Sequence, residues 1–197
     1  MKPKTELSSC HQETLLLIAR TTLEQHLKGE TPIVSPPEYV ELQVPDHGVF
    51  VSLHRKEQLR GCLGCFSAPG PLWQTVMEFS MASASDSRFV YDPVTFGELC
   101  QLQIEISVLS PLRRIKDYKE AILGEHGIVV EKGAMRGVFL PQVATETGWT
   151  LEEFWSQCCS LKTGLGPDAY KDSSVVLSIF DAQVFSEKPT GETLENS

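Results

Sequence analysis

Residues 59–66 (Leu-Arg-Gly-Cys-Leu-Gly-Cys-Phe) constrain the fold of this chain more than any other stretch. They follow an apolar run from Val49 to Leu53 and a polar turn from Arg55 to Gln58. This order is typical of a β-hairpin, so residues 59–66 are expected to form its return strand. Because glycine weakens a strand, Gly61 and Gly64 indicate a bulge, or a place where a ligand or another backbone comes close.

Cys62 lies between these two glycines and has two interpretations. In an extended strand Arg60 and Cys62 share a face, and a neighbouring guanidinium favours the nucleophilic thiolate. Free cysteine is also among the most buried residue types. The stretch alone therefore favours the simpler interpretation, a small buried residue in a tightly packed strand.

Helical spacing of apolar residues predicts three main helices. The first begins at a capping box of Ser9 and Gln12 and stops at Gly29, with Leu16, Ala19, Leu23 and Leu27 on one face. The second runs from Pro71 to about Ala84, and the third from a Thr150–Glu153 capping box to Gly164. A short helix is expected over residues 117–123, and Thr95 with Glu98 predicts a short capped turn.

Alternation predicts several further strands. Residues 102–109 place Ile104 and Ile106 on one face and Glu105 and Ser107 on the other, which is typical of a half-buried strand. Short strands are also expected over residues 39–44, 128–130, 138–140 and 174–185, and the middle two form a second hairpin. Strands and helices do not alternate as βαβ units, so the fold class is α+β with antiparallel sheets flanked by helices.

The composition is that of a globular protein, with 41% apolar and 22% charged residues among 197. With 17 Lys and Arg against 26 Asp and Glu, the net charge of −9 disfavours binding to nucleic acid. No apolar run is long enough for a secretory or membrane segment, so the six cysteines are expected to be reduced thiols in the cytoplasm. Residues 1–8 are expected to form a flexible N-terminus and residues 188–197 a flexible tail.

The Cys62–Cys65 pair is a weak metal or redox motif. A structural zinc site needs four ligands, and no second pair stands at a matching spacing. In an extended strand, residues three apart face opposite sides at about 10 Å, which is too far for a disulfide. We therefore expect no Cys62–Cys65 disulfide and no metal site, and no cofactor motif is present.

Several ordered motifs resemble the AMMECR-domain family. Residues 59–64 resemble its LRGCIG signature, residues 86–89 with 93–95 its DxRFxPVT stretch, and residues 104–111 its IEISVLSP strand. Residues 127–130 and 137–144 are similar to its GLIV…GLLLPQVA hairpin, and Gly148, Trp149 and Phe154 also match. The resemblance spans residues 9–187, and the subgroup that is most similar is the prokaryotic AmmeMemoRadiSam system protein A.

Two positions depart from the family pattern. The family has Thr at the position of Cys65, so a CxxC dithiol is not shared. Ser160 stands where the family's Cys-x-Lys-Ala-Gly-Leu begins, which removes a second thiol there unless Cys159 replaces it. The resemblance implies two unequal lobes within residues 9–187, a cleft near Cys62, and a Memo-like protein and a radical S-adenosylmethionine (SAM) enzyme as partners. It does not supply a reaction.

Two functions from different classes follow. In the first, the protein is an enzyme or enzyme component in which Cys62 is the nucleophile and Glu105 the acid or base. In the second, it is a non-catalytic scaffold that presents a small-molecule or peptide ligand; a nucleic-acid-linked regulator is a weaker third. In either of the first two, the residues expected to line one binding site with Cys62 are Arg60, Gly61, Gly64, Arg88, Ser107 and Gln142.

Overall fold

The computed structural model describes residues 6–188. The chain divides into two compact units, Met1–Val108 with Gln183–Ser197, and Leu109–Ala182. The architecture is mixed α+β, as predicted. Each unit has its own buried apolar cluster.

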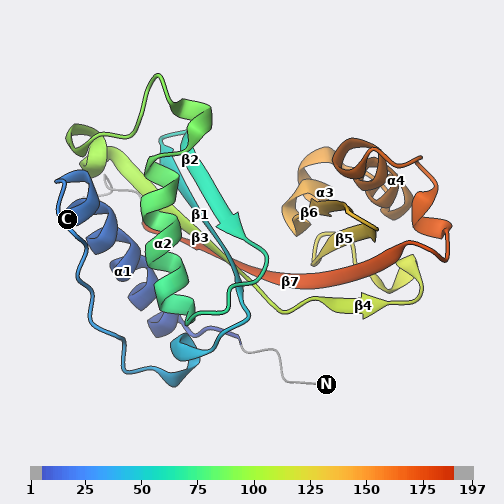
Figure 1. The fold of residues 1–197 in the computed structure, drawn as a ribbon, viewed down its shortest axis with the longest axis horizontal. Coiled ribbons are helices and arrows are strands. Elements are labelled where there is room, and N and C mark those ends of the chain that lie inside the picture. Colours follow the sequence, from blue (N-terminus) through green and yellow to red (C-terminus); the bar gives the residue numbers. More distant parts are fainter. Residues whose placement is uncertain (1–5, 189–197) are drawn as a thin grey trace, which may run out of the picture. The chain divides into compact units, whose positions relative to one another are not determined.

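In the first unit, two long helices cover one face of a sheet (Figure 1). The strands lie in the order β2-β1-β3, with the end of β7 beside β3. The elements are α1 (Ser9–Leu27), η1 (Val40–Gln43), β1 (Gly48–Arg55), β2 (Gln58–Cys65), α2 (Leu72–Ala84), η2 (Ser87–Phe89), η3 (Phe96–Gln101), β3 (Leu102–Leu109) and β7 (Val176–Ser186).

The core of this unit confirms the predicted hairpin and half-buried strand. β1 and β2 pair antiparallel, with Ser52 opposite Cys62. Ile104 and Ile106 are fully buried in the same cluster as Val49 and Val51 of β1. Because side chains alternate along a strand, the opposite face of the sheet carries Ser52 from β1 and Glu105 and Ser107 from β3.

The strand predicted over residues 39–44 is wrong. This segment forms the 3₁₀ turn η1, in which the Leu42 N–H donates to the Tyr39 carbonyl oxygen at 3.1 Å. Leu42 is the buried residue of the turn, whereas Val40 is 72% exposed. The alternation in this short run is therefore a coincidence of composition, since no face of it is buried along its length.

The first helix begins one residue earlier than predicted. Ser8, not Ser9, is the N-cap, and its hydroxyl accepts from the His11 N–H while His11 Nδ1 accepts from the Ser8 N–H. Leu7 is 3% exposed, and its N–H donates to Gln183 Oε1 at 2.8 Å. Residues 1–5 and 189–197 of the predicted flexible ends lie outside the described residues.

The second unit is a smaller antiparallel sheet packed against short helices. β7 lies between β4 (Arg113–Ile115) and β5 (His126–Lys132), and β6 (Met135–Phe139) pairs with β5 as the predicted second hairpin. The helical elements are η4 (Tyr118–Glu120), α3 (Pro141–Thr147), α4 (Leu151–Gln157), the π-helix η5 (Cys158–Thr163) and η6 (Ala169–Lys171).

Local signals in the second unit were partly correct. The Thr150–Glu153 capping box begins α4, and Gly164 ends η5 with a left-handed φ of 72°. The helix predicted over residues 117–123 is reduced to the three residues of η4, because its backbone leaves the helical region at Ala121. No helix among residues 6–188 is long and apolar enough to span a membrane.

Candidate functional site

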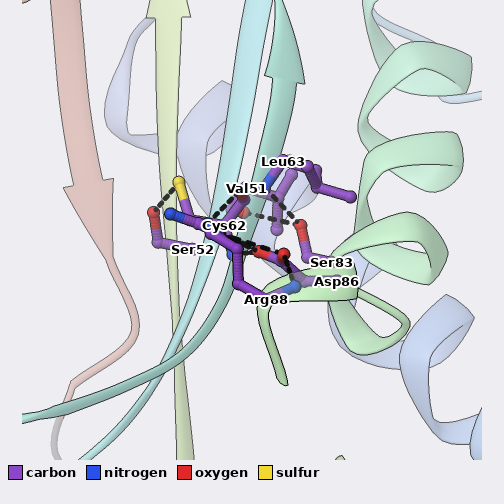
Figure 2. Close-up of polar contacts among 7 residues, drawn as sticks. All are labelled: Val51, Ser52, Cys62, Leu63, Ser83, Asp86 and Arg88. Carbon is purple, nitrogen blue, oxygen red and sulfur yellow. Dashed lines mark hydrogen bonds and ion pairs between the residues drawn. The ribbon is translucent and has the colours of Figure 1, made fainter. Parts of the chain in front are cut away.

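The backbone N–H and carbonyl oxygen of Cys62 are both bound by one short motif (Figure 2). The Asp86 carboxylate accepts the Cys62 N–H at 3.0 Å, and the Arg88 guanidinium donates to the Cys62 carbonyl oxygen at 2.8 Å. Asp86 and Arg88 also bind each other through several hydrogen bonds. We call this arrangement, made by Asp86 and Arg88 on the backbone of Cys62, the Cys62 clamp.

The clamp works because β2 is an edge strand. It stands at the end of the strand order, so its outward backbone groups have no neighbouring strand to bind. The turn after α2 supplies the missing partners. Asp86 is the N-cap of η2, where its side chain also accepts the Arg88 N–H at 3.0 Å. One buried carboxylate therefore fixes η2 and β2 together.

Electrostatics favour the charged form of both members of the clamp. Hydrogen bonds from Arg88 hold the pKa of Asp86 well below its usual range, although burial of the carboxylate opposes this. The same pairing raises the pKa of Arg88. The Asp86 side chain is 2% exposed and that of Arg88 is 56% exposed, so the acid is the buried partner and the base reaches solvent.

Helix α2 approaches the hairpin closely next to Cys62. The Ser83 hydroxyl accepts from the Leu63 N–H at 3.0 Å and donates to the Val51 carbonyl oxygen at 2.7 Å, so it bridges β1 and β2. A Cβ on Gly61 would stand 2.0 Å from the Ser83 carbonyl oxygen. The sequence left open whether Gly61 marks a bulge or the close approach of a ligand or another backbone. In this structure the backbone of Ser83 is the close neighbour.

The Cys62 side chain points away from α2, to the face that carries Ser52 (Figure 2). Ser52 lies directly opposite Cys62 in the ladder, and its hydroxyl donates to Cys62 Sγ at 3.2 Å. Cys62 is of intermediate exposure. Cys62 is therefore partly exposed and its thiol has a polar neighbour, while its backbone is held by the clamp.

Arg60 lies in a different environment from the one that alternation suggested. The register skips Arg60 between the Leu53–Gly61 and His54–Leu59 pairs, so a β-bulge re-aims its side chain. Its guanidinium donates to Glu98 at 3.1 and 3.2 Å and to the Asp92 carboxylate at 2.8 Å. Arg60 is 3% exposed. All three guanidinium nitrogens are engaged, so we assign Arg60 to an ion cluster rather than to a ligand.

Glu98 anchors that cluster. Burial alone would raise the pKa of Glu98, but hydrogen bonds from Arg60 and the Thr95 N–H outweigh it and lower the pKa. The side chain of Glu98 is 8% exposed, whereas that of Asp92 is 78% exposed. Thr95 and Glu98 also form the predicted capping box of η3. The glutamate of this capping box therefore also neutralises Arg60, which lies 38 residues earlier in the chain.

The other predicted site residues fall in two places. Glu105, partly exposed, and Ser107, 5% exposed, lie on the β3 face that is opposite the core, the same face as Ser52. Gln142 lies in the first turn of α3 in the second unit, where its carbonyl oxygen accepts from the Thr145 hydroxyl at 2.8 Å. Gly64 lies beside Phe50, whose ring atoms would stand 2.5 Å from an added Cβ.

Three residues that build the site were missed from sequence. Ser52, Ser83 and Asp86 all bond to the Cys62 segment from separate elements. Asp86 alone had a usable signal, because an acid two residues before Arg88 at the end of a predicted helix is typical of a capped turn. Ser52 and Ser83 are ordinary polar positions in a strand and a helix.

Neither a metal site nor a disulfide involves the candidate site. None of the six cysteines, all within residues 6–188, is in a disulfide. No group of three His, Cys, Asp or Glu residues in that part of the chain could hold a metal ion.

A separate hollow of about 440 Å³ is lined by none of the predicted site residues. Arg20 in its wall binds Glu187 and the Leu99 and Leu102 carbonyl oxygens, so it ties the residue that follows β7 to α1 and η3.

Comparison with known proteins identifies the family. The AMMECR1 sequence profile matches residues 16–185. This chain belongs to the AMMECR1 family. A protein of Methanothermobacter thermautotrophicus is 39% identical over 188 residues, covering 92% of this chain and 96% of that protein. Protein MJ0810 of Methanocaldococcus jannaschii is 36% identical over 187 residues, covering 90% of each.

A solved AMMECR1-family structure has the same fold. The crystal structure of the uncharacterised protein PH0010 from Pyrococcus horikoshii matches with a TM-score of 0.77 at 35% identity, over 91% of this chain and 93% of that one. In this AMMECR1 domain, the two motifs at residues 59–64 and 86–89 meet at the Cys62 clamp. The family's function is not supplied by these relatives.

Proposed function

We propose that this AMMECR1-family protein is a thiol-dependent enzyme, or a component of one, in which Cys62 is the nucleophile. The observation that carries the proposal is the contrast at Cys62: the clamp binds both its backbone N–H and its carbonyl oxygen, while its thiol accepts a hydrogen bond from Ser52 and the residue is partly exposed. Fixed geometry at a reactive group reduces the ordering needed to reach a transition state.

Ser52 supports a nucleophilic role because its hydroxyl, which donates to Cys62 Sγ at 3.2 Å, holds the sulfur in one position. In the proposed reaction the thiolate adds to an electrophilic carbon of a double bond in a small molecule or peptide. The carbon–sulfur bond forms as the π bond breaks, and the other atom of the double bond takes up the electron pair and a proton. Glu105, on the same face of the sheet, is the proposed acid or base that supplies or removes the proton. Gly64, Arg88 and Ser107 remain proposed ligand contacts.

The proposed partners rest on the resemblance to AmmeMemoRadiSam system protein A. We propose a cytoplasmic protein that works with a Memo-like protein and a radical SAM enzyme, and the absence of disulfides among its six cysteines suits a reducing compartment. Co-purification from the source cell tests this. Recovery of either partner supports the proposal, and repeated purifications that recover neither argue against a stable complex.

A thiol-reactivity profile tests the nucleophile. Native protein is treated with iodoacetamide for increasing times, and alkylation of each cysteine is followed by peptide mass spectrometry. We expect Cys62 to react faster than Cys10, which is exposed on α1 and serves as the internal reference. Slower alkylation of Cys62 than of Cys10 would overturn the proposal. Ser52→Ala should slow Cys62 and leave Cys10 unchanged.

A scaffold is the second candidate, and one observation favours it. The segment that follows the clamp exposes apolar side chains, with Val90 64% and Tyr91 100% exposed. Exposed apolar residues that are close in sequence are typical of a surface that a partner covers. Uniformly slow alkylation together with loss of partner binding on Tyr91→Ser would favour the scaffold over the enzyme.

A further inference from the structure

Phe50 lies on the thiol-bearing face of the sheet rather than in a core. It is partly exposed, and it belongs to neither of the two buried apolar clusters formed by the described residues. Its Cγ and Cδ1 would stand 2.5 Å from a Cβ on Gly64, so the ring lies directly against bare backbone. Phe66 meets it edge-to-face with ring centroids 5.1 Å apart. Gly64 therefore leaves room for an aromatic pair on this face.

The strand register puts this aromatic pair next to the thiol. Phe50 is opposite Gly64, and Ser52 is opposite Cys62. Phe50 and Ser52 are therefore two residues apart on β1, as Gly64 and Cys62 are on β2. Two residues along a strand span about 7 Å and return to the same face. One end of a small ligand can therefore contact the Phe50 ring while another part reaches the Cys62 sulfur.

We propose that Phe50 and Phe66 form the apolar wall of the Cys62 site, and that its ligand carries a flat apolar group, such as an aromatic ring, beside a thiol-reactive carbon. This inference rests on the proposed function and narrows its substrate class. Aromatic rings stack or pack edge-to-face against such a group more favourably than against a small alkyl group. Both rings are partly exposed and lie outside the two buried apolar clusters of the described residues, so part of this aromatic surface is open to a ligand.

Two maleimides that differ in one substituent test the wall. In each reaction the thiolate adds to the carbon–carbon double bond, and the other carbon takes a proton from water, so no oxidant is needed. We measure the alkylation rates of Cys62 with N-phenylmaleimide and N-ethylmaleimide by peptide mass spectrometry. The ratio of these two rates at Cys10 corrects for intrinsic reactivity, because Cys10 is exposed on α1.

The phenyl preference is the ratio of the N-phenylmaleimide rate to the N-ethylmaleimide rate at Cys62, divided by the same ratio at Cys10. We expect it to be about fivefold, which corresponds to the free energy of one aromatic contact. Phe50→Leu keeps apolar bulk but removes the ring, and it should bring the preference close to one. Phe96→Leu is the matched control, since Phe96 is 47% exposed in the same unit. It should keep the preference. Fast alkylation of Cys62 without a phenyl preference would overturn the wall and leave the nucleophile intact.

A non-reactive probe tests the aromatic wall independently of the Cys62 nucleophile. N-phenylsuccinimide has the phenyl ring but lacks the reactive carbon–carbon double bond of the maleimide. Its binding is followed by NMR of labelled phenylalanine, with Phe50→Leu and Phe66→Leu used to assign the signals. Shifts at both rings support the wall even when Cys62 is slow, in which case only the nucleophile is rejected. A slow Cys62 without such shifts rejects both.

Discussion

The Asp86 carboxylate accepts the backbone N–H of Cys62, a residue 24 positions earlier in the chain, at 3.0 Å. This contact joins the turn after α2 to an edge strand, and Arg88 completes it at the Cys62 carbonyl oxygen. An edge strand exposes backbone groups that invite pairing with another chain. The clamp therefore protects the edge at Cys62 and fixes the backbone that carries the thiol.

Removal of the Asp86 carboxylate should destabilise the fold. Asp86→Ala leaves the partly buried Cys62 N–H without its acceptor and Arg88 without its ion partner. We expect the free energy of unfolding to fall by about 3 kcal/mol, measured by urea denaturation at pH 7. The control is Asp168→Ala, whose 75% exposed side chain pairs with Lys171 and should change stability by less than about 1 kcal/mol. Equal effects of the two variants would contradict the clamp's role.

Protonation of Asp86 should lower the stability of the fold at low pH. Its pKa in the folded state lies below the ordinary aspartate value of about 3.9. The stabilisation is therefore fully present above about pH 4 and is lost as the pH falls further, because the unfolded chain takes up the proton first. Urea denaturation at pH 6 and pH 3 should show a smaller difference between wild type and Asp86→Asn at pH 3. An unchanged difference would mean that the carboxylate is not charged in the fold.

Periodic patterns predicted the elements because burial along a whole face leaves a repeated signal. β3 is the clearest case, since Ile104 and Ile106 are both fully buried, as their alternation indicated. The first hairpin and the α4 capping box were predicted for the same local reasons. The segment over residues 39–44 failed because a short run with one buried residue carries too little information to separate a strand from a turn.

The site depends on contacts that no local pattern contains. Alternation predicted that Arg60 lies beside the Cys62 thiol, but a one-residue bulge breaks the alternation at Arg60. The acids that Arg60 binds, Asp92 and Glu98, lie 32 and 38 residues later in the chain. The clamp likewise joins segments through a helix end whose position depends on packing of the core. The motifs indicated which residues matter, whereas the roles of Arg60 and Asp86 required the fold.

The ion cluster of Arg60 should depend on its buried acid and hardly on its exposed one. Glu98→Gln leaves a 3% exposed guanidinium without its main counter-charge, and we expect the free energy of unfolding to fall by about 3 kcal/mol. Asp92→Asn removes a partner that is 78% exposed and should lower it by less than about 1 kcal/mol. Urea denaturation of both variants compares the two acids on one arginine. A larger effect of Asp92→Asn would show that the cluster is controlled from the surface.

A methyl group on Gly61 should disrupt the packing of α2 on the hairpin. The added Cβ would meet the Ser83 carbonyl oxygen at 2.0 Å and the Ser83 carbonyl carbon at 2.9 Å, and both are backbone atoms that cannot rotate away. We expect Gly61→Ala to lower the free energy of unfolding by about 3 kcal/mol, which corresponds to a fall in Tm of about 6 to 12 °C for a chain of this size.

Gly70→Ala is the matched control for this substitution. The nearest atom to its added Cβ is the flexible Gln74 Oε1 at 3.8 Å, so it should keep the wild-type Tm or raise it slightly. Because Ser83 also bridges Val51 and Leu63, the shift forced by Gly61→Ala should extend to the strand that carries Cys62. Hydrogen exchange should therefore accelerate at the Cys62 and Leu63 amides in Gly61→Ala and stay unchanged in Gly70→Ala. A Gly61→Ala protein with wild-type Tm and wild-type exchange would show that the helix can move away without loss.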